Sequence, residues 1–311
     1  MFTIFYLLLA FFTGGIIPFQ TAANSNLKQQ MSSPLLASFV NCTVGSIALF
    51  IIMMLSTEES FYRSPEEWAS YDWWMYTSGA LGAIILMVAM TLLIKLGMVG
   101  TSLATMTGMM VTGMVLDEFG AFGMPMHEFD AIRAIGLVIM ILGVMAALRV
   151  FAHIKQHAAT FSLFTVLWFL LGCFSGSLLA TQAAINAVFR VELHSVLYCA
   201  LISMVSTSAI VLVLAFCFKQ YPTRLRRIQI KGRWWLFIGG FVGLTNIILS
   251  AELVPLIGAG CLMTLCIAGQ LTASLLLDYF GFMEVKKRAV SLSQIIGLIM
   301  IIGAVALIRM A

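Results

Sequence analysis

The sequence predicts an all-α integral membrane protein with ten transmembrane helices, arranged as two five-helix repeats of inverted topology. Three observations lead to this prediction: the composition is apolar, windows of membrane-spanning length recur, and the second half repeats the first. Of the 311 residues, 61% are hydrophobic and only 10% are charged, with a mean hydropathy of +1.04. Because soluble domains carry about 25% charged residues, this chain cannot cover a water-exposed surface.

Each apolar window holds about 20 residues, enough to cross a hydrocarbon core of about 30 Å as a helix. The loops between the windows are short, so we expect almost no mass outside the bilayer. The first window lacks the basic start and the small-residue cleavage site of a signal peptide, so it is expected to be a transmembrane helix. The ten windows are 3–23, 34–55, 74–94, 98–116, 132–150, 162–184, 196–218, 234–250, 258–277 and 292–308.

The second half repeats the first at an offset of 162 residues, which changes to 161 after the second window. FQTAANSNL (19–27) corresponds to TQAAINAVF (181–189), and VLDEFGAF corresponds to LLDYFGFM. Paired Trp, Asp and Phe-Gly at a constant spacing indicate duplication. The predicted repeats are residues 1–156 and 157–311. Because each holds five spans, an odd number, the second must enter the membrane in the opposite sense.

The basic residues orient the chain. With the amino terminus outside, most of the 17 Lys and Arg residues lie in the cytoplasm, chiefly those of the loop KQYPTRLRRIQIKGR (219–233). Positive residues beside transmembrane helices are enriched on that side. The sequence therefore predicts that both termini are extracytoplasmic. Topology alone explains the basic loop, so no nucleic-acid partner is expected.

Cysteine and histidine give no sign of a metal or another cofactor. The six cysteines fall inside apolar windows without CxxC or CxxH spacing, which is typical of small apolar packing residues. His153 and His157 are four residues apart, but they lie in the link after the fifth window. A membrane enzyme would need a clustered acid, base, nucleophile or metal set, and neither HExxH nor GxSxG is present. The sequence predicts that the protein is not an enzyme.

Several motifs carry a family resemblance across essentially the whole chain. They are G-x5-Q-x3-N at the end of the first span, the following SSPLLASFVNCTVGSIALF, the Trp-Trp and glycine pattern that opens the third span, and AGQLTASLLLDYFGF in the second copy. The chain resembles the YdcZ family of the drug/metabolite transporter superfamily, in its fused two-copy form. The resemblance implies a ten-span carrier of small metabolites in the bacterial inner membrane. The first copy departs from the pattern, because Met109 stands where the second has Gln270.

Two amide pairs are the first candidates for a site. Gln20 and Asn24 lie four residues apart, as do Gln182 and Asn186, so each pair shares one helix face. An unpaired amide in lipid costs several kcal/mol, so both pairs must face protein or a water-filled cavity. Two interpretations are open: the amides are polar gates or substrate contacts, or they cap the last turns of their spans.

Other polar residues extend this set. Asn41 and Ser203 are equivalent in the two second spans and are either cavity lining or interhelical contacts, and Gln270 joins them as a cavity candidate. Glu252 is a candidate for proton coupling if it faces the cavity, or else it is solvated at the interface. Asp117 and Asp278 are expected to end their spans at the interface.

The sequence therefore predicts a secondary transporter that moves a small organic solute by alternating access through a cavity between the repeats. A lining of amides and hydroxyls suits a neutral or zwitterionic metabolite or a drug-like compound. The expected partners are this solute and the lipid bilayer, and the protein is a monomer or a homodimer. A non-transporting membrane scaffold and a passive channel are the alternatives.

Overall fold

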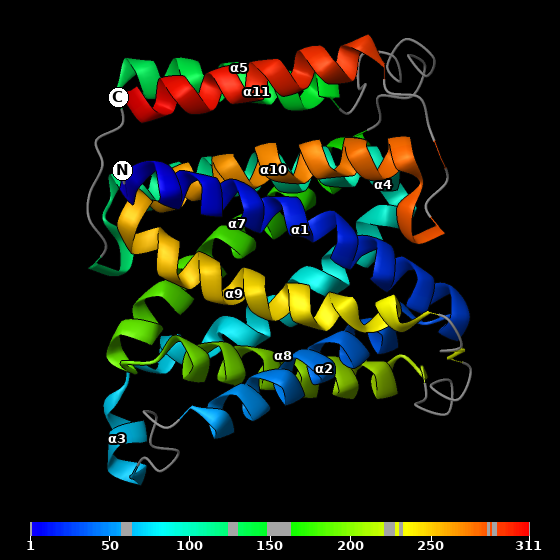
Figure 1. Ribbon diagram of the computed structural model, residues 1–311, viewed down its shortest axis with the longest axis vertical. Coiled ribbons are helices and arrows are strands. Elements are labelled where there is room, and N and C mark those ends of the chain that lie inside the picture. Colours follow the sequence, from blue (N-terminus) through cyan, green and yellow to red (C-terminus); the bar gives the residue numbers. More distant parts are fainter. Residues whose placement is uncertain are drawn as a thin grey trace.

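The computed structural model describes residues 2–56, 64–123, 130–147, 163–220, 228–229, 233–284, 287 and 291–310, and every regular element among them is a helix. Most of the long helices lie side by side across the longest axis of the molecule (Figure 1). α1 begins and α11 ends on the same side. The expected repeat boundary at residue 156, His153 and His157, and most of the basic loop lie outside the described residues.

The first repeat holds α1 (Phe2–Met31), α2 (Pro34–Leu55), α3 (Pro65–Ser70), η1 (Trp73–Thr77), α4 (Ser78–Glu118), η2 (Ala121–Gly123) and α5 (Ala131–Ala147). The second holds α7 (Leu163–Glu192), α8 (Val196–Cys217), η4 (Trp234–Phe237), α9 (Ile238–Ile257), α10 (Ala259–Phe280), η5 (Phe282–Glu284) and α11 (Leu292–Met310). Within the described ranges, six helices are long and apolar enough to cross a membrane, and three further apolar helices are shorter. These helices confirm the helical membrane class; ten spans in inverted repeats stay a prediction.

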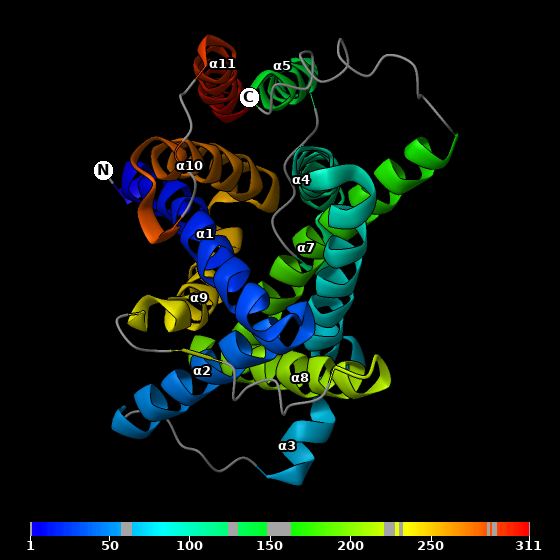
Figure 2. The same cartoon turned by 90° about the vertical axis from the view of Figure 1, so that its right-hand side faces the viewer.

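The third and fourth expected spans form one continuous helix. α4 covers 41 residues, and Figure 2 shows that it bends sharply into two arms. The equivalent helices of the second repeat are separate, because Gly258 has a φ of 82° that ends α9 before α10 begins. A straight helix as long as α4 would extend about 60 Å, twice the hydrocarbon core, so the bend lets α4 fit a bilayer.

Helices of one repeat pack mainly against helices of the other. α1 lies against α9 and α10, and α7 lies against α4, which holds the equivalent positions of the first repeat. α2 packs on α8 and α5 packs on α11, and each of these pairs joins equivalent helices. Figures 1 and 2 show the α5–α11 pair as a separate layer at one end of the molecule. Such reciprocal contacts are typical of two units related by a twofold operation.

Glycines allow the closest of these crossings. A Cβ atom on Gly14 of α1 would lie 1.9 Å from the carbonyl oxygen of Cys266 in α10. At the equivalent position of the second repeat, a Cβ atom on Gly176 would lie 2.0 Å from the carbonyl oxygen of Thr105 in α4. Small residues let membrane helices approach this closely. The first helix of each repeat therefore crosses the other repeat at an equivalent point.

The direction of equivalent helices differs in Figure 1. α2 begins on the side where α1 ends, whereas α8 begins on the side where α1 begins, so the packed α2 and α8 are antiparallel. Below, the side where α1 ends is called the α1 end. The side where α7 ends and α8 begins is called the α7 end.

Candidate functional site

The amide pairs lie inside their helices and do not cap them. α1 continues to Met31 and α7 to Glu192, beyond the ends of the expected spans. The following helices are capped by serines: Ser33 Oγ accepts a hydrogen bond from the backbone nitrogen of Leu36, and Ser195 Oγ accepts one from that of Tyr198. The capping interpretation of the amides is therefore wrong. Hydropathy failed to locate the end of α1 because the last two turns of this helix, NSNLKQQM, are polar enough to resemble a loop.

One pair belongs to a buried network that we call the α7 cluster, consisting of Ser78, Gln182, Asn186 and Ser203. Ser78 Oγ donates to Asn186 Oδ1 at 2.6 Å and lies 2.6 Å from Ser203 Oγ. Because the one hydroxyl hydrogen of Ser78 goes to Asn186, Ser203 donates to Ser78. Gln182 Nε2 adds a bond of 2.8 Å to the carbonyl oxygen of Ser78. The cluster joins α4 of the first repeat to α7 and α8 of the second.

The other pair belongs to the α1 cluster, which consists of Gln20, Asn24 and Asn41. Asn41 Nδ2 donates to Asn24 Oδ1 and, at 3.3 Å, to the carbonyl oxygen of Ala37. Asn41 is only 3% exposed, yet its Oδ1 has no hydrogen-bond partner among the described residues. The half-buried Gln20 side chain likewise has none within the described ranges. The side-chain bond of this cluster joins α1 to α2, both in the first repeat.

The two clusters occupy equivalent places but differ at two positions: Asn41 matches Ser203, and Ser78 has a glycine as its counterpart. Gly239 of α9 stands where the first repeat has Ser78, and a Cβ atom there would lie 2.8 Å from Asn41 Oδ1. The two glutamines have equivalent surroundings, because each lies against the equivalent glycine of the other repeat. Gln20 Nε2 lies 3.1 Å from a Cβ atom built on Gly243, and Gln182 Nε2 lies 3.0 Å from one built on Gly82. The predicted residues Gln20, Asn24, Asn41, Gln182, Asn186 and Ser203 thus fall into two groups, each facing the other repeat.

Gln270 belongs to neither cluster. It is half-buried on α10, and no described residue hydrogen-bonds to its side chain. Its neighbour Gly269 marks the crossing with α1, where a Cβ atom would lie 1.9 Å from the carbonyl oxygen of Phe11. Its assignment as a cavity residue stays a prediction.

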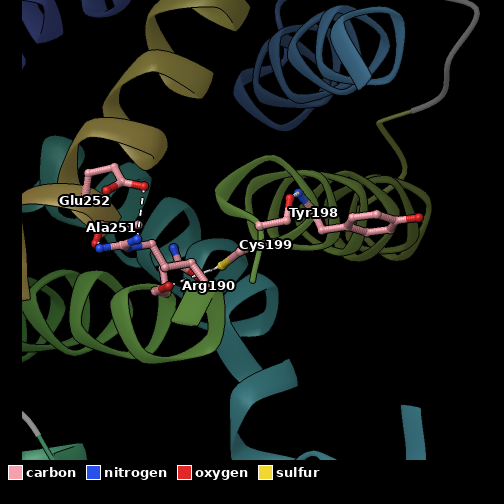
Figure 3. Close-up of polar contacts among 7 residues, drawn as sticks. Arg190, Tyr198, Cys199, Ala251 and Glu252 are labelled. Carbon is pink, nitrogen blue, oxygen red and sulfur yellow. Dashed lines mark hydrogen bonds and ion pairs between the residues drawn. The ribbon is translucent and has the colours of Figure 1, made fainter. Parts of the chain in front are cut away.

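Glu252 forms an ion pair that the sequence did not reveal. Its carboxylate lies 3.1 Å from Arg190 Nη1, and Arg190 Nε donates to the carbonyl oxygen of Ala251 at 2.8 Å (Figure 3). The Glu252 side chain is 41% exposed and that of Arg190 is 20% exposed. The pair ties α7 to α9 at the α7 end, beside the aromatic contacts of Phe189. An exposed carboxylate paired with arginine supports the interfacial interpretation over proton coupling within a cavity.

Asp117 lies one residue before the end of α4, as expected, but it also contacts the other repeat. It is buried, and its two carboxylate oxygens accept hydrogen bonds from the backbone nitrogens of Ala259 and Gly260 at 2.6 and 2.8 Å. It therefore caps the amino terminus of α10, in the other repeat, where the backbone N–H groups have no helical partner. Asp278, its counterpart, is half-buried. Sequence could not show this role, because the cap and the helix lie 142 residues apart.

The polar residues bring together no metal site among the described residues, where no group of three or more His, Cys, Asp or Glu side chains occurs. Large apolar side chains instead cover the outside of the helices, as lipid contact requires; examples are Phe12, Ile51, Val138, Leu170 and Ile299. Two residues that the sequence did not single out, Ser78 and Arg190, make the contacts that join helices at the α7 end.

A helical bundle with an apolar outside and polar side chains between two repeats has the architecture of a membrane transporter. The model of one family, described as "Putative inner membrane exporter, YdcZ", matches residues 5–146 and again residues 167–307. This chain belongs to the YdcZ family of the drug/metabolite transporter superfamily, in its two-copy form. The duplication expected from the sequence is thereby confirmed.

The fold is also similar to that of solved structures. One, titled "Crystal structure of protein", matches with a TM-score of 0.70 at 15% sequence identity, over 98% of this chain and 96% of that chain. No curated protein matches the sequence significantly.

Proposed function

We propose that this protein is a secondary carrier that exports a small organic solute by alternating access between residues 1–156 and 157–311. The observation that carries the proposal is the pairing of two equivalent polar clusters with the opposite repeat, inside a bundle whose outside is apolar. Buried polar groups are costly in a membrane and mark solute pathways. Export is the direction that the family description supports.

An inverted relation between the repeats gives such a carrier two alternative half-open states. The antiparallel course of α2 and α8 and the reciprocal contacts of α1 and α7 support this relation. On this basis the α1 cluster belongs to one membrane face and the α7 cluster to the other. Each cluster then acts as a gate, and opening one while closing the other moves the solute. We retain the extracytoplasmic placement of both termini from the charge distribution.

The chemistry of the clusters favours a neutral or zwitterionic solute. Both clusters consist of amides and hydroxyls, which donate and accept hydrogen bonds without a net charge. The nearby charges of Arg190 and Glu252 neutralise each other. A bare ion would need a charged or carbonyl-lined path, which these clusters do not provide.

The test is solute exchange in liposomes containing the purified protein. A thermal-shift screen against metabolites and drug-like compounds first selects ligands, since a ligand that binds only the folded state stabilises it by RT ln(1 + [L]/Kd). Each ligand is then tested for saturable counterflow. The Gln182→Ala/Asn186→Ala variant is expected to lose both the shift and the exchange.

Ser46→Ala is the matched control, because the one partner of Ser46 Oγ among the described residues is the carbonyl oxygen of Cys42 within its own helix. It is expected to retain both activities. Stabilisation without exchange would argue for a non-transporting scaffold. Exchange that is linear in concentration would argue for a passive channel.

A further inference from the structure

We infer that Ser78 is a latch that closes the α7 end, and that the carrier rests closed at this end because the α1 end has no equivalent latch. This inference rests on the proposed function and deepens it, since it assigns unequal strengths to the two gates. It also makes Ser78 a positioning residue for the amides of Gln182 and Asn186.

Ser78 is placed to join the two repeats. It is the first residue of α4, and it is 3% exposed. Its hydroxyl bonds to Asn186 of α7 and to Ser203 of α8, and its carbonyl oxygen accepts from Gln182. The next residue lies close as well, since the carbonyl oxygen of Gly79 is 3.1 Å from Thr207 Oγ1, which also reaches the carbonyl oxygen of Ser203 in its own helix at 2.7 Å. Opening the α7 end requires α4 to leave α7 and α8, which breaks these bonds together.

The α1 end cannot form the same latch. Gly239 has no hydroxyl at the position of Ser78, so α9 offers no side-chain hydrogen bond to Asn24 or Asn41, and Asn41 Oδ1 has no partner among the described residues. The hydrogen bonds that do cross between the repeats at this end come from residues outside the cluster. Asn26 Nδ2 reaches the carbonyl oxygen of Met283 at 3.3 Å, Ser33 Oγ reaches Gln220 Oε1, and the Gln229 nitrogen reaches Gln30 Oε1. These bonds are exposed or only partly buried, so water replaces them at less cost than the two buried hydroxyl bonds of Ser78.

One further contact between the repeats occurs at the α7 end alone. Phe189 of α7 meets Tyr76 with ring centroids 5.3 Å apart and Tyr71 with centroids 5.8 Å apart, whereas its counterpart at the α1 end is Leu27, which has no ring. The ion pair of Arg190 and Glu252 lies within the second repeat, so it fixes α7 against α9 and does not itself join the repeats. The aromatic contacts, like the bonds of Ser78, cross between the repeats and favour closure of the α7 end.

The protein carries its own reporter for this latch. Cys199 of α8 is 1% exposed, and its thiol lies 3.3 Å from the carbonyl oxygen of Asn186. Cys199 belongs to a buried cluster with Met53 and Met75 of the first repeat, so opening of the α7 end would uncover this thiol. Cys266 serves as an internal reference, since it is also buried but lies at the α1–α10 crossing, 3.5 Å from the carbonyl oxygen of Ala10.

The experiment measures how fast N-ethylmaleimide modifies Cys199 and Cys266 in the full-length protein, resolved by peptide mass spectrometry. Ser78→Ala is expected to raise the Cys199 rate about tenfold, which corresponds to about 1.4 kcal/mol, and to leave the Cys266 rate unchanged. Ser203→Ala, which retains the Ser78–Asn186 bond, is expected to give a smaller rise. The double variant is expected to match Ser78→Ala alone, because coupled residues are non-additive. Ser46→Ala should change neither rate.

An unchanged labelling rate of Cys199 in Ser78→Ala would overturn the latch. An equal increase in the labelling rates of Cys199 and Cys266 would also overturn it, because it would indicate general loosening of the fold. If Ser78→Ala fails to fold, an unchanged Cys199 rate in Ser203→Ala overturns it. The labelling needs no substrate, so it is independent of the counterflow assay. Failure of counterflow with the expected labelling would reject the carrier while leaving the latch in place.

Discussion

Asp117 and Ala259 lie at the junction of the two repeats, with the carboxylate of one 2.6 Å from the backbone nitrogen of the other. The second carboxylate oxygen binds the next backbone nitrogen, that of Gly260. This arrangement requires that α9 and α10 separate at Gly258, because a continuous helix would use these N–H groups internally. The break in the second repeat and the carboxylate of the first therefore depend on each other.

Removal of this cap should destabilise the protein. Asp117→Ala leaves two buried backbone donors without their partner, which costs about 2–4 kcal/mol. We expect a fall in melting temperature of about 5 °C or more in detergent. Asp117→Asn retains an acceptor and should fall by less. Asp72→Asn is the control, because the Asp72 side chain makes no cap hydrogen bond; an equal fall in both asparagine variants would contradict the capping role.

The helix crossings predict a second stability difference. Gly269→Ala would place a Cβ atom 1.9 Å from the carbonyl oxygen of Phe11, and neither backbone can yield without separating α1 from α10. We expect little folded protein, measured as the monodisperse fraction in size-exclusion chromatography. Gly303→Ala meets nothing within 4 Å and should behave as the parent, or slightly better because alanine favours a helix. Normal folding of Gly269→Ala would show that the crossing is looser than the structure has it.

Local patterns sufficed for the helical class and the duplication, because hydropathy and spacing are read along the chain. Contacts between helices could not be predicted in this way. Asn24 and Asn186 were expected to face protein or a cavity, but their partners depend on which helices meet in space. The hydrogen bond of Ser78 could not be predicted for the same reason, because it requires that Asn186 of the other repeat lies beside it. The single helix α4 was missed because the window 74–94 and the window 98–116 were separated by hydropathy alone.

The true helix caps provide a direct comparison with the amides. Ser195→Ala removes the acceptor for the backbone nitrogen of Tyr198, which typically costs about 1 kcal/mol. We expect a fall of about 2–3 °C in melting temperature, and recovery with Ser195→Asp, which restores an acceptor at this position. If the alanine variant melts like the parent while Asn186→Ala shows no loss of ligand binding, both the cap and the gate assignments fail together.

The ion pair at the α7 end predicts unequal effects of its two partners. Arg190→Ala removes both the contact with Glu252 and the hydrogen bond to the carbonyl oxygen of Ala251, whereas Glu252→Gln removes only the charge of one partner. Because both side chains are partly exposed, the ion pair itself contributes only about 0.5 kcal/mol. We therefore expect Arg190→Ala to melt clearly below the parent and Glu252→Gln to melt within about 1 °C of it.

In counterflow, Glu252→Gln should keep the pH dependence of the parent protein, since a partly exposed, arginine-paired carboxylate has a structural role. Loss of that dependence in Glu252→Gln, with an unchanged melting temperature, would instead assign proton coupling to Glu252.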